Sequence, residues 1–194
     1  IINRIHSSNS INDAEMAKII ENTQRDINIA FINEISIICK KLNLNFQNVM
    51  KLASTKWNFL RFTPGLVGGH CISVDPYYLT YVLKKIKYDP KVILSGRGVN
   101  ENYSNFIFQF IKERFISKKT KILLAGITYK EDCNDIRNSK AIILANKLIG
   151  RYKYVDVFDP NINLGKINNM NLVEKPKKNF YDLIVITVRT HLTI

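Results

Sequence analysis

The sequence has few cysteines, and no two of them have the spacing of a metal or redox motif. Cys39, Cys71 and Cys133 are the three cysteines among 194 residues. Such a sparse, odd set supports neither a disulfide framework nor a zinc site. We therefore expect no bound metal and a reducing, cytoplasmic setting.

Long apolar runs are missing as well. No segment approaches the roughly 18 consecutive apolar residues that a membrane-spanning helix needs, and residues 1–10 lack the plan of a signal peptide. Proline and glycine number five and eight, which excludes collagen-like and low-complexity chains. These absences predict a packed, soluble protein that is neither exported nor bound to a membrane.

Acidic residues are scarce relative to basic ones. The chain has 29 lysines and arginines against 16 acidic residues, and its net charge is +13. Such a charge suits a polyanion or a phosphorylated small molecule. The basic residues are spread along the whole sequence, and neither a helix-turn-helix signature nor an RNP-type strand is present. We therefore expect no nucleic-acid partner, and keep nucleic-acid binding only as an alternative because the charge is large.

The first part of the chain has the pattern of a long amphipathic helix. Residues 10–42 contain no glycine or proline and place apolar residues on one stripe. A shorter helix is predicted over 46–53, with Asn45 as its cap. Residues 57–71, WNFLRFTPGLVGGHC, fit neither a helix nor a strand period, which predicts a well-defined loop.

Two aspartates, each followed by a proline, indicate the starts of two further helices. Asp75 and Asp89 are predicted as N-caps, with the proline at the first helical position. The second of these helices should reach about Phe115, with an interruption at Gly96 and Gly98. The first hundred residues are thus predicted to be mainly helical.

The last third of the chain alternates between strands and a helix. Strands are predicted at 121–127, 154–158 and 182–188, with a helix over 138–148 that Gly150 stops. This order implies a right-handed crossover and a parallel sheet. In such sheets ligands bind beyond the carboxyl ends of the strands.

A few residues in these elements could carry chemistry. Cys71 lies in the glycine-rich loop, where a thiolate nucleophile could have exposure, oriented N–H groups and a partner in Asp75. Lys18 and Asn22 are four residues apart and share one helix face. Taken singly, each has a plainer explanation: a buried cysteine, a helix cap and a solvated face. The residues alone leave these roles open.

Three longer motifs decide between these readings. AEMAKIIENTQRDIN, KWNFLRFTPGLVGGHCISVDPYYLT and GITYKEDCNDIRNS follow one another at compatible separations. Together they resemble the UDP-glucose/GDP-mannose dehydrogenase family, and most of all its branch acting on UDP-N-acetylglucosamine or UDP-N-acetylgalactosamine. The resemblance runs from about Ile11 to Val188.

The resemblance implies an α/β fold with two domains. Residues 10–116 would be a mainly helical central domain that dimerises through the long helix, and residues 117–194 a Rossmann-like UDP-sugar-binding domain. Residues 1–9 would be a linker or the end of a preceding cofactor domain. The chain is expected to be truncated at both ends.

The resemblance also implies a reaction. These enzymes oxidise the C6 alcohol of a nucleotide sugar to a carboxylate with two NAD molecules, through an aldehyde held as a cysteine thiohemiacetal and then a thioester. Cys71 would be the nucleophile, while Lys18 and Asn22 line the catalytic pocket. Asp75 would handle a proton or water, and either Lys18 or Asp75 could be the first base. The product would feed surface polysaccharide synthesis.

Further residues are implied in binding. Arg61, Phe62 and Gly68 match the loop that wraps the nucleotide sugar, where the Gly68 backbone would approach the ligand closely. Lys130 matches a lysine that reaches the UDP-sugar, and Arg137 an arginine directed towards the dinucleotide. The alternatives are a solvated lysine and, for Arg137, an ion pair with Asp132 or Asp135.

The sequence departs from UDP-glucose enzymes at two positions. Val74 replaces a lysine that often lies near the cofactor, and Thr55 takes the place of an arginine that crosses the dimer to the sugar. Both departures weaken an assignment to UDP-glucose itself. Cys39 is expected in the core and Cys133 without a role, and adjacency to the nucleophile does not make His70 a base.

A GxGxxG fingerprint after a strand is also missing, and Gly96-x-Gly98 is no substitute for it. The chain is therefore expected not to hold NAD alone, as a fragment, a split subunit or a truncated reading frame. The alternative function is a non-catalytic UDP-sugar-binding or dimerisation remnant. Whether the sugar is gluco or galacto stays open.

Overall fold

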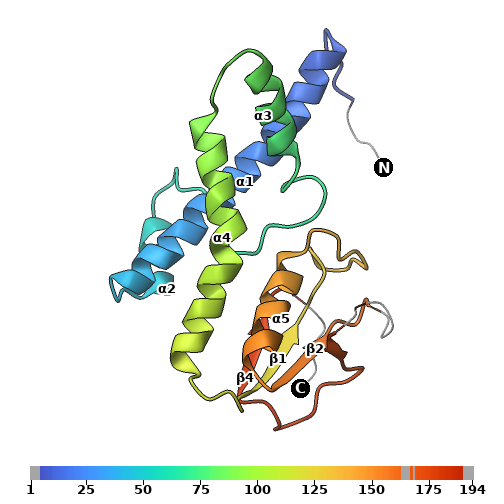
Figure 1. Cartoon of the computed structure of the whole chain (residues 1–194). Helices are drawn as coiled ribbons and strands as arrows, with labels where there is room; N and C mark the ends of the chain where they lie inside the picture. Colours follow the sequence, from blue (N-terminus) through green and yellow to red (C-terminus); the bar gives the residue numbers. More distant parts are fainter. Residues whose placement is uncertain (1–4, 163–166, 168, 190–194) are drawn as a thin grey trace.

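The computed structural model describes residues 5–162, 167 and 169–189. Figure 1 shows a helical part, formed by the first half of the chain, above a sheet that α5 covers on one face. The helices are α1 (Ile11–Lys41), α2 (Phe46–Ala53), α3 (Asp75–Lys85), α4 (Lys91–Arg114) and α5 (Lys140–Arg151), and the strands are β1 (Lys121–Ala125), β2 (Tyr154–Phe158), β3 (Asn171–Leu172) and β4 (Leu183–Ile186). The α/β fold is as predicted.

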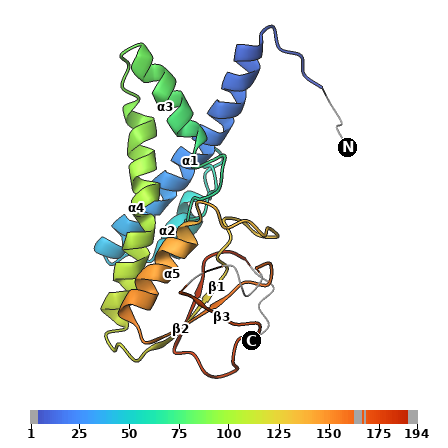
Figure 2. The same cartoon turned by 45° about the vertical axis from the view of Figure 1, so that its right-hand side comes forward.

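The long helix α1 begins and ends as its sequence predicts. The Ser10 side chain accepts a hydrogen bond from the Asp13 amide, while Lys40 and Lys41 lie in the last turn, where cations interact favourably with the helix dipole. Figures 1 and 2 show α4 crossing α1. The predicted interruption of α4 is wrong: a Cβ at Gly96 would lie 3.4 Å from Ile27, so this glycine lets the two helices approach closely.

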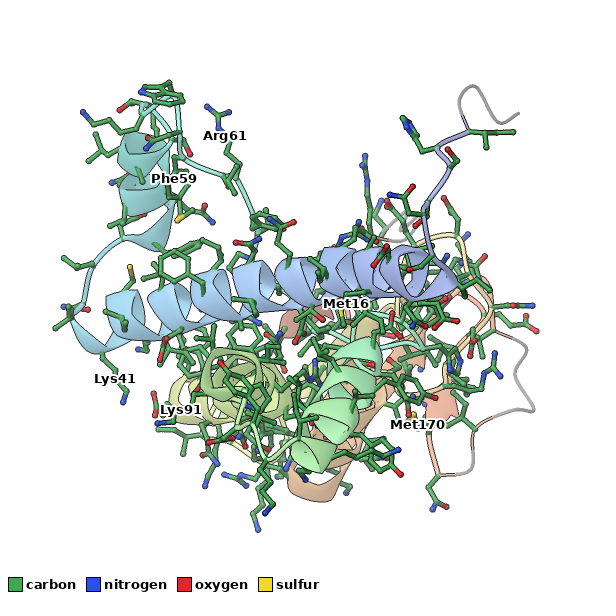
Figure 3. All side chains as sticks on the ribbon, turned by 90° about the horizontal axis from the view of Figure 1, so that it is seen from above. Met16, Lys41, Phe59, Arg61, Lys91 and Met170 are labelled. Carbon is green, nitrogen blue, oxygen red and sulfur yellow. The ribbon has the colours of Figure 1, made fainter. Side chains whose placement is uncertain are left out.

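The short helix α2 is also as predicted, and the Asn45 side chain caps it by accepting from the Asn48 amide. Figure 3 shows α2 standing off one end of α1, with Phe59 and Arg61 on the chain that returns from it. The returning segment is the predicted loop, without helix or strand up to Cys71.

The predicted caps of the next two helices are wrong by one residue. Val74 is the N-cap of α3, because the amides of Val74 and Asp75 both already donate to the Cys71 carbonyl, at 3.0 and 2.8 Å. Asp75 therefore lies inside the first turn and its carboxylate is not used for capping. At α4 the N-cap is Pro90, whose carbonyl accepts from the Leu94 amide, so that Asp89 lies outside the helix.

The sheet is parallel throughout and has the strand order β3-β2-β1-β4. Its central strand β1 packs against α5 through a core of fully buried residues, among them Leu124, Leu144 and Leu148. The chain moves from β1 to β2 and β3 on one side and returns to β4 on the other. The order therefore switches direction beside β1, which is where ligands bind in open α/β sheets.

Several bounds in this part differ from the prediction: β1 ends at Ala125 instead of residue 127, and α5 begins at Lys140 instead of residue 138. The two-residue strand β3 was not predicted, and β4 is shorter than the predicted 182–188. Helix α5 runs through Gly150 to Arg151 instead of stopping at the glycine. It ends because Tyr152 leaves the helix as extended chain, is 3% exposed and donates its hydroxyl to the Phe115 carbonyl at 2.8 Å.

The helical and sheet parts meet along α4 and α5, which lie side by side in Figures 1 and 2. Lys140, at the start of α5, forms an ion pair with Glu101 of α4. The predicted boundary between residues 116 and 117 lies in the connection from α4 to β1, and the two-domain division stays a prediction. Residues 1–4 of the predicted N-terminal segment and residues 190–194 of the predicted second domain lie outside the described residues.

The described residues contain neither a membrane-spanning helix nor a cluster of metal-binding side chains. Within residues 5–162, 167 and 169–189, no helix is long and apolar enough to cross a membrane. The same residues contain no group of three or more histidine, cysteine or acidic side chains able to hold a metal ion. Cys39 is buried in the helical part, as predicted, and Cys133 is half-buried.

Candidate active site

A pocket of about 540 Å³ opens where the helical and sheet parts meet. We call it the junction pocket. Its walls come from α1, from the loop before α3 and from the segment that follows β1. The lining residues named below are Lys18, Asn22, Arg25, Gly65, Gly68, His70, Cys71, Tyr129 and Lys130. Five of the predicted site residues, Lys18, Asn22, Gly68, Cys71 and Lys130, thus share one pocket.

Cys71 is presented to this pocket by a tight turn. We call residues 63–74 the Cys loop. Gly69 adopts a φ of +86°, a conformation that glycine adopts without strain. The Ser73 hydroxyl donates to the Gly69 carbonyl at 2.6 Å, and the next two residues donate to the Cys71 carbonyl. The backbone is therefore held by its own hydrogen bonds, and the Cys71 thiol is exposed to solvent.

The predicted site residue Asp75 does not line the junction pocket, but it contacts Asn22, which does. The Asn22 Nδ2 donates to Asp75 Oδ2 at 2.6 Å, which joins α1 to the first turn of α3. Asn22 is 2% exposed, so this geometry is fixed by the surrounding packing. A carboxylate at this position could accept a proton from a water or an alcohol.

Lys18 lies one turn before Asn22, at the mouth of the junction pocket. Its ammonium group donates to Glu21 at 2.6 Å, and its side chain is 66% exposed. The hydrogen bond from Lys18 lowers the pKa of Glu21. Exposed pairs of this kind are weak, so Lys18 can turn towards an anion in the pocket. Arg25 adds a second cation to the same wall.

The segment after β1 forms the opposite wall. Asp159, at the end of β2, accepts hydrogen bonds from the amides of Ile127 and Thr128 at 2.8 and 3.2 Å. This aspartate fixes the turn that carries Tyr129 and Lys130 into the pocket lining. The Lys130 ammonium lies 5.6 Å from the centre of the Tyr129 ring. Both loops beyond adjacent strand ends thus shape the pocket, as the parallel sheet predicts.

The glycines of the Cys loop have a packing role that the sequence did not reveal. A Cβ at Gly68 would lie 2.6 Å from the Asn138 carbonyl oxygen, and one at Gly69 would lie 2.5 Å from the Tyr129 ring. Asn138 also donates to the Gly69 carbonyl at 3.3 Å. The two glycines therefore let the sheet part press against the Cys loop. The predicted contact of Gly68 with a sugar stays a prediction.

Arg137 does not line the junction pocket. Its guanidinium donates to both carboxylate oxygens of Asp135, at 2.7 to 3.1 Å, which is one of the alternatives considered for it. These hydrogen bonds hold the pKa of Asp135 far below its ordinary value. The same carboxylate lies 3.2 Å from Nε2 of His70, so Asp135 also joins the sheet part to the Cys loop.

Arg61 and Phe62 lie apart from the other predicted site residues. They line a separate hollow of about 390 Å³ beside α2, together with Phe46 and Met50. Arg61 donates to the Ser54 carbonyl at 3.1 Å, and Figure 3 shows its side chain pointing away from α1. Within one chain these two residues do not contact the junction pocket, and their predicted role in substrate binding stays a prediction.

Sequence reasoning missed a buried polar network beneath the Cys loop. Asp26, Asn33, Arg97 and Asn100 are each 0 or 1% exposed and are joined by hydrogen bonds. One signal was available: Asp26 and Asn33 are seven residues apart, which places them on the helix face of the buried Ala30. Polar residues on a buried face are rarely left unpaired.

Comparison with known proteins identifies the two parts. The profile of the UDP-glucose/GDP-mannose dehydrogenase family, central domain, matches residues 12–102. The profile of the UDP binding domain of the same family matches residues 123–191. The two matches fall on the helical and sheet parts described above.

Individual relatives agree with these profiles. The UDP-N-acetyl-D-glucosamine 6-dehydrogenase of Salmonella typhi is 43% identical over 192 residues, covering 94% of this chain and 45% of the relative. Protein CapL of Staphylococcus aureus is 41% identical over 192 residues, covering 95% and 45%. The chain spans about half the length of the curated relatives it matches.

Solved structures share the fold. The UDP-N-acetyl-mannosamine dehydrogenase Cap5O from Staphylococcus aureus superposes with a TM-score of 0.73 at 31% identity, covering 92% of this chain and 41% of that one. A UDP-glucose dehydrogenase from Pyrobaculum islandicum gives a TM-score of 0.79 at 22% identity, covering 93% and 45%. The chain belongs to the UDP-glucose/GDP-mannose dehydrogenase family, of which it comprises the central and UDP-binding regions.

Proposed function

We propose that the complete protein oxidises the C6 alcohol of a UDP-N-acetylhexosamine to the carboxylate, with NAD as oxidant, for surface polysaccharide synthesis. The observation that carries this proposal is the junction pocket, which combines an exposed thiol with an amide and two lysines. The relatives at 41 to 43% identity support it, because one of them is named as a UDP-N-acetyl-D-glucosamine 6-dehydrogenase.

In this proposal Cys71 retains the intermediate aldehyde. The first two-electron oxidation converts the alcohol to the aldehyde, and the Cys71 sulfur then bonds to C6 to form a thiohemiacetal. A second two-electron oxidation gives a thioester. One water cleaves the carbon–sulfur bond, which releases the carboxylate and restores the thiol. The balance is one water consumed and four electrons removed for each sugar.

Lys18, Asn22 and Asp75 would stabilise charge and move protons. The ammonium of Lys18 and the amide of Asn22 reach the pocket from one helix face and would stabilise an oxyanion at C6. Asp75, which accepts a hydrogen bond from Asn22 at 2.6 Å, would activate the water that cleaves the thioester. Lys18 and Asp75 are both candidates for the base that accepts the first alcohol proton.

We assign the nucleotide end of the ligand to the opposite wall. Lys130 lines the pocket beyond β1, across from Lys18 and Arg25 on α1. Three cations around one opening suit a diphosphate, which carries its charge on several oxygens. Tyr129 provides an aromatic surface beside Lys130.

The described residues do not form a dinucleotide site by themselves. The turn after β1 contains one glycine, Gly126, and no glycine-rich loop leads from this strand into α5. Arg137 is 71% exposed at this turn, and we propose it as a contact for the dinucleotide. NAD, when bound to the complete protein, would accept the electrons of both oxidation steps.

The test is NADH formation by the protein expressed from its complete reading frame. The substrates to compare are UDP-N-acetylglucosamine, UDP-N-acetylgalactosamine and UDP-N-acetylmannosamine, the last because several relatives are mannosamine dehydrogenases. We expect about two NADH for each sugar from one of them. The Cys71→Ser variant should lose turnover or stall after the first oxidation.

A different result would change the assignment. If the intact protein binds UDP-sugars in calorimetry but forms no NADH with any of the three, the protein is a non-catalytic UDP-sugar-binding module. Two NADH for each sugar from Cys71→Ser at the rate of the intact protein would remove Cys71 from the mechanism.

A further inference from the structure

Asn33 of α1 holds the beginning of the Cys loop. Its Nδ2 donates to the Gly65 carbonyl at 3.0 Å, and its Oδ1 accepts from the Gly65 amide at 2.9 Å. One side chain thus satisfies both backbone groups of a residue that belongs to no helix or strand. Asn33 itself is 0% exposed, so water does not compete for these bonds.

The anchor continues into a connected chain of buried groups. Asn33 also donates to Oδ1 of Asn100 at 2.9 Å, and Asn100 donates to Oδ1 of Asp26 at 2.7 Å. Arg97 donates to the same Asp26 oxygen at 2.7 Å. The network therefore alternates between α1 and α4 beneath the Cys loop.

Arg97 extends the network to α3, which follows the Cys loop directly. Its guanidinium carbon lies 5.4 Å from the centre of the Tyr77 ring, in the first turn of α3 just after Asp75. It also pairs with Glu101, which in turn pairs with Lys140 at the start of α5. Gly65 lies before Cys71 in the sequence and Tyr77 lies after it, and both residues contact the same network.

Stability alone does not account for such a network. Replacing buried ionic groups with apolar residues of similar volume is often neutral or stabilising, because burial of charge is costly. A connected and buried polar network instead favours one arrangement, since other arrangements leave more of its groups unpaired. In the observed arrangement only Asp26 Oδ2 and Arg97 Nε, among the side-chain atoms of these four residues, lack a hydrogen-bond partner. Here that arrangement fixes Gly65 in the Cys loop and Tyr77 in α3 relative to α1, where Lys18 and Asn22 line the junction pocket.

We propose that Asn33 and Arg97 are positioning residues for Cys71: through Gly65 and Tyr77 they fix the Cys loop relative to Lys18 and Asn22. The proposal rests on the proposed function for its catalytic consequence. The placement of the loop itself can be measured without turnover.

The test compares Asn33→Ala and Arg97→Lys with the unmodified protein, all expressed from the complete reading frame. In Asn33→Ala we expect amide hydrogen exchange across residues 65–75 to become at least tenfold faster, and kcat to fall at least tenfold. Small displacements of reacting groups can cost up to about a hundredfold in rate. The Kd for UDP should stay within twofold, because Lys130 does not depend on Asn33. Arg97→Lys keeps the charge but loses the planar fork, and should lower kcat at least fivefold.

Tyr152→Phe is the matched control, because it removes one buried hydrogen bond in the sheet part, away from the Cys loop. It should leave kcat and exchange of the Cys loop within twofold of the unmodified protein. The buried Cys39 reports on general loosening of α1 and should resist iodoacetamide in every variant.

Two results would overturn the proposal. One is exchange of residues 65–75 within twofold of the unmodified protein in both variants. The other is a general loosening, in which Cys39 labelling and exchange of α5 rise together with exchange of the Cys loop. If the unmodified protein forms no NADH, the proposed function fails, while loop exchange and Cys39 labelling still decide whether Asn33 and Arg97 hold the loop.

Discussion

At position 69 the protein depends on a residue without a side chain. Gly69 has a φ of +86°, and a Cβ there would lie 2.5 Å from the Tyr129 ring. Each of these two conflicts has its own cost, about 1–3 kcal/mol for a strained backbone and a similar amount for overpacking. The turn that presents Cys71 and the contact with the sheet part therefore both require glycine.

We predict that Gly69→Ala lowers the free energy of unfolding by roughly 2–6 kcal/mol, from the sum of these two costs. Urea denaturation of the variant and the unmodified protein measures the difference. Gly65→Ala is the control within the same loop, because a Cβ at Gly65 meets nothing within 4 Å. Equal stability of the two variants would show that Tyr129 does not constrain the turn.

The residues of the junction pocket show how much of the site could be predicted from individual residues in the sequence. Lys18 and Asn22 were predicted to share a helix face, and they do, while Cys71 and Lys130 reach the same pocket from distant segments. Their spacing alone does not indicate that they meet. The three motifs taken together did predict that these residues share one site.

Arg61 shows the limit of that reasoning. A motif places a residue in a loop, but it does not determine which way the loop turns. Here α2 and the returning chain hold Arg61 beside Ser54, outside the junction pocket. The buried network was missed for a related reason. The partners of Asp26 and Asn33 lie on another helix, α4, and the periodicity of one helix does not predict which helix packs against it.

Among the secondary-structure elements, β2 and the chain leading into β4 are joined by a buried carboxylate. Asp156 of β2 accepts a hydrogen bond from the Tyr181 hydroxyl at 2.7 Å. Burial, followed by this hydrogen bond, raises the pKa of Tyr181 to about 12. An unfolded tyrosine ionises at about 10, so the neutral hydroxyl stabilises the fold fully below that pH. The stabilisation is lost as the pH rises through 12.

We predict that Tyr181→Phe is less stable than the unmodified protein at pH 8 by about 1 kcal/mol, the usual contribution of one hydrogen bond. The difference in free energy of unfolding should shrink as the pH rises from 10 to 12. Urea titrations of both proteins at a series of pH values test this. A difference that stays constant up to pH 12 would mean that Tyr181 does not titrate as described.

The elements themselves were largely predictable, because their signals are local. The bounds of α2 and β2 agree with the prediction, and α1 differs from it by one residue at each end. The errors arise where a tertiary contact overrides a local signal: Gly96 packs against α1, and burial of Tyr152 ends α5 beyond Gly150. The strand β3 has two residues, too few for a periodic pattern.

At the scale of the whole molecule, α1 carries several exposed apolar side chains on one face. Ile20, Phe31 and Ile38 are 55, 53 and 41% exposed. Exposed apolar residues gathered on one element suit contact with another protein. We therefore keep the prediction of a homodimer that forms through α1.

Sedimentation velocity of the complete protein tests this. We expect the mass of a dimer, and a shift towards the monomer in Phe31→Glu, because a buried, unpaired carboxylate is costly at an interface. Ile143→Glu serves as the control, because Ile143 is 40% exposed on α5 in the sheet part, away from α1. A monomer at all concentrations of the unmodified protein would exclude the dimer.

The junction pocket also has a consequence for how the protein is made. Lys18 is near the start of α1, whereas Lys130 lies beyond β1, so the two walls leave the ribosome at very different times. The helical part can collapse early around α1 and α4, but the Cys loop lacks Tyr129 and Asn138 until the sheet part arrives. Contacts so distant in sequence form slowly. The Cys71 thiol therefore gains its complete surroundings late in the synthesis of this chain.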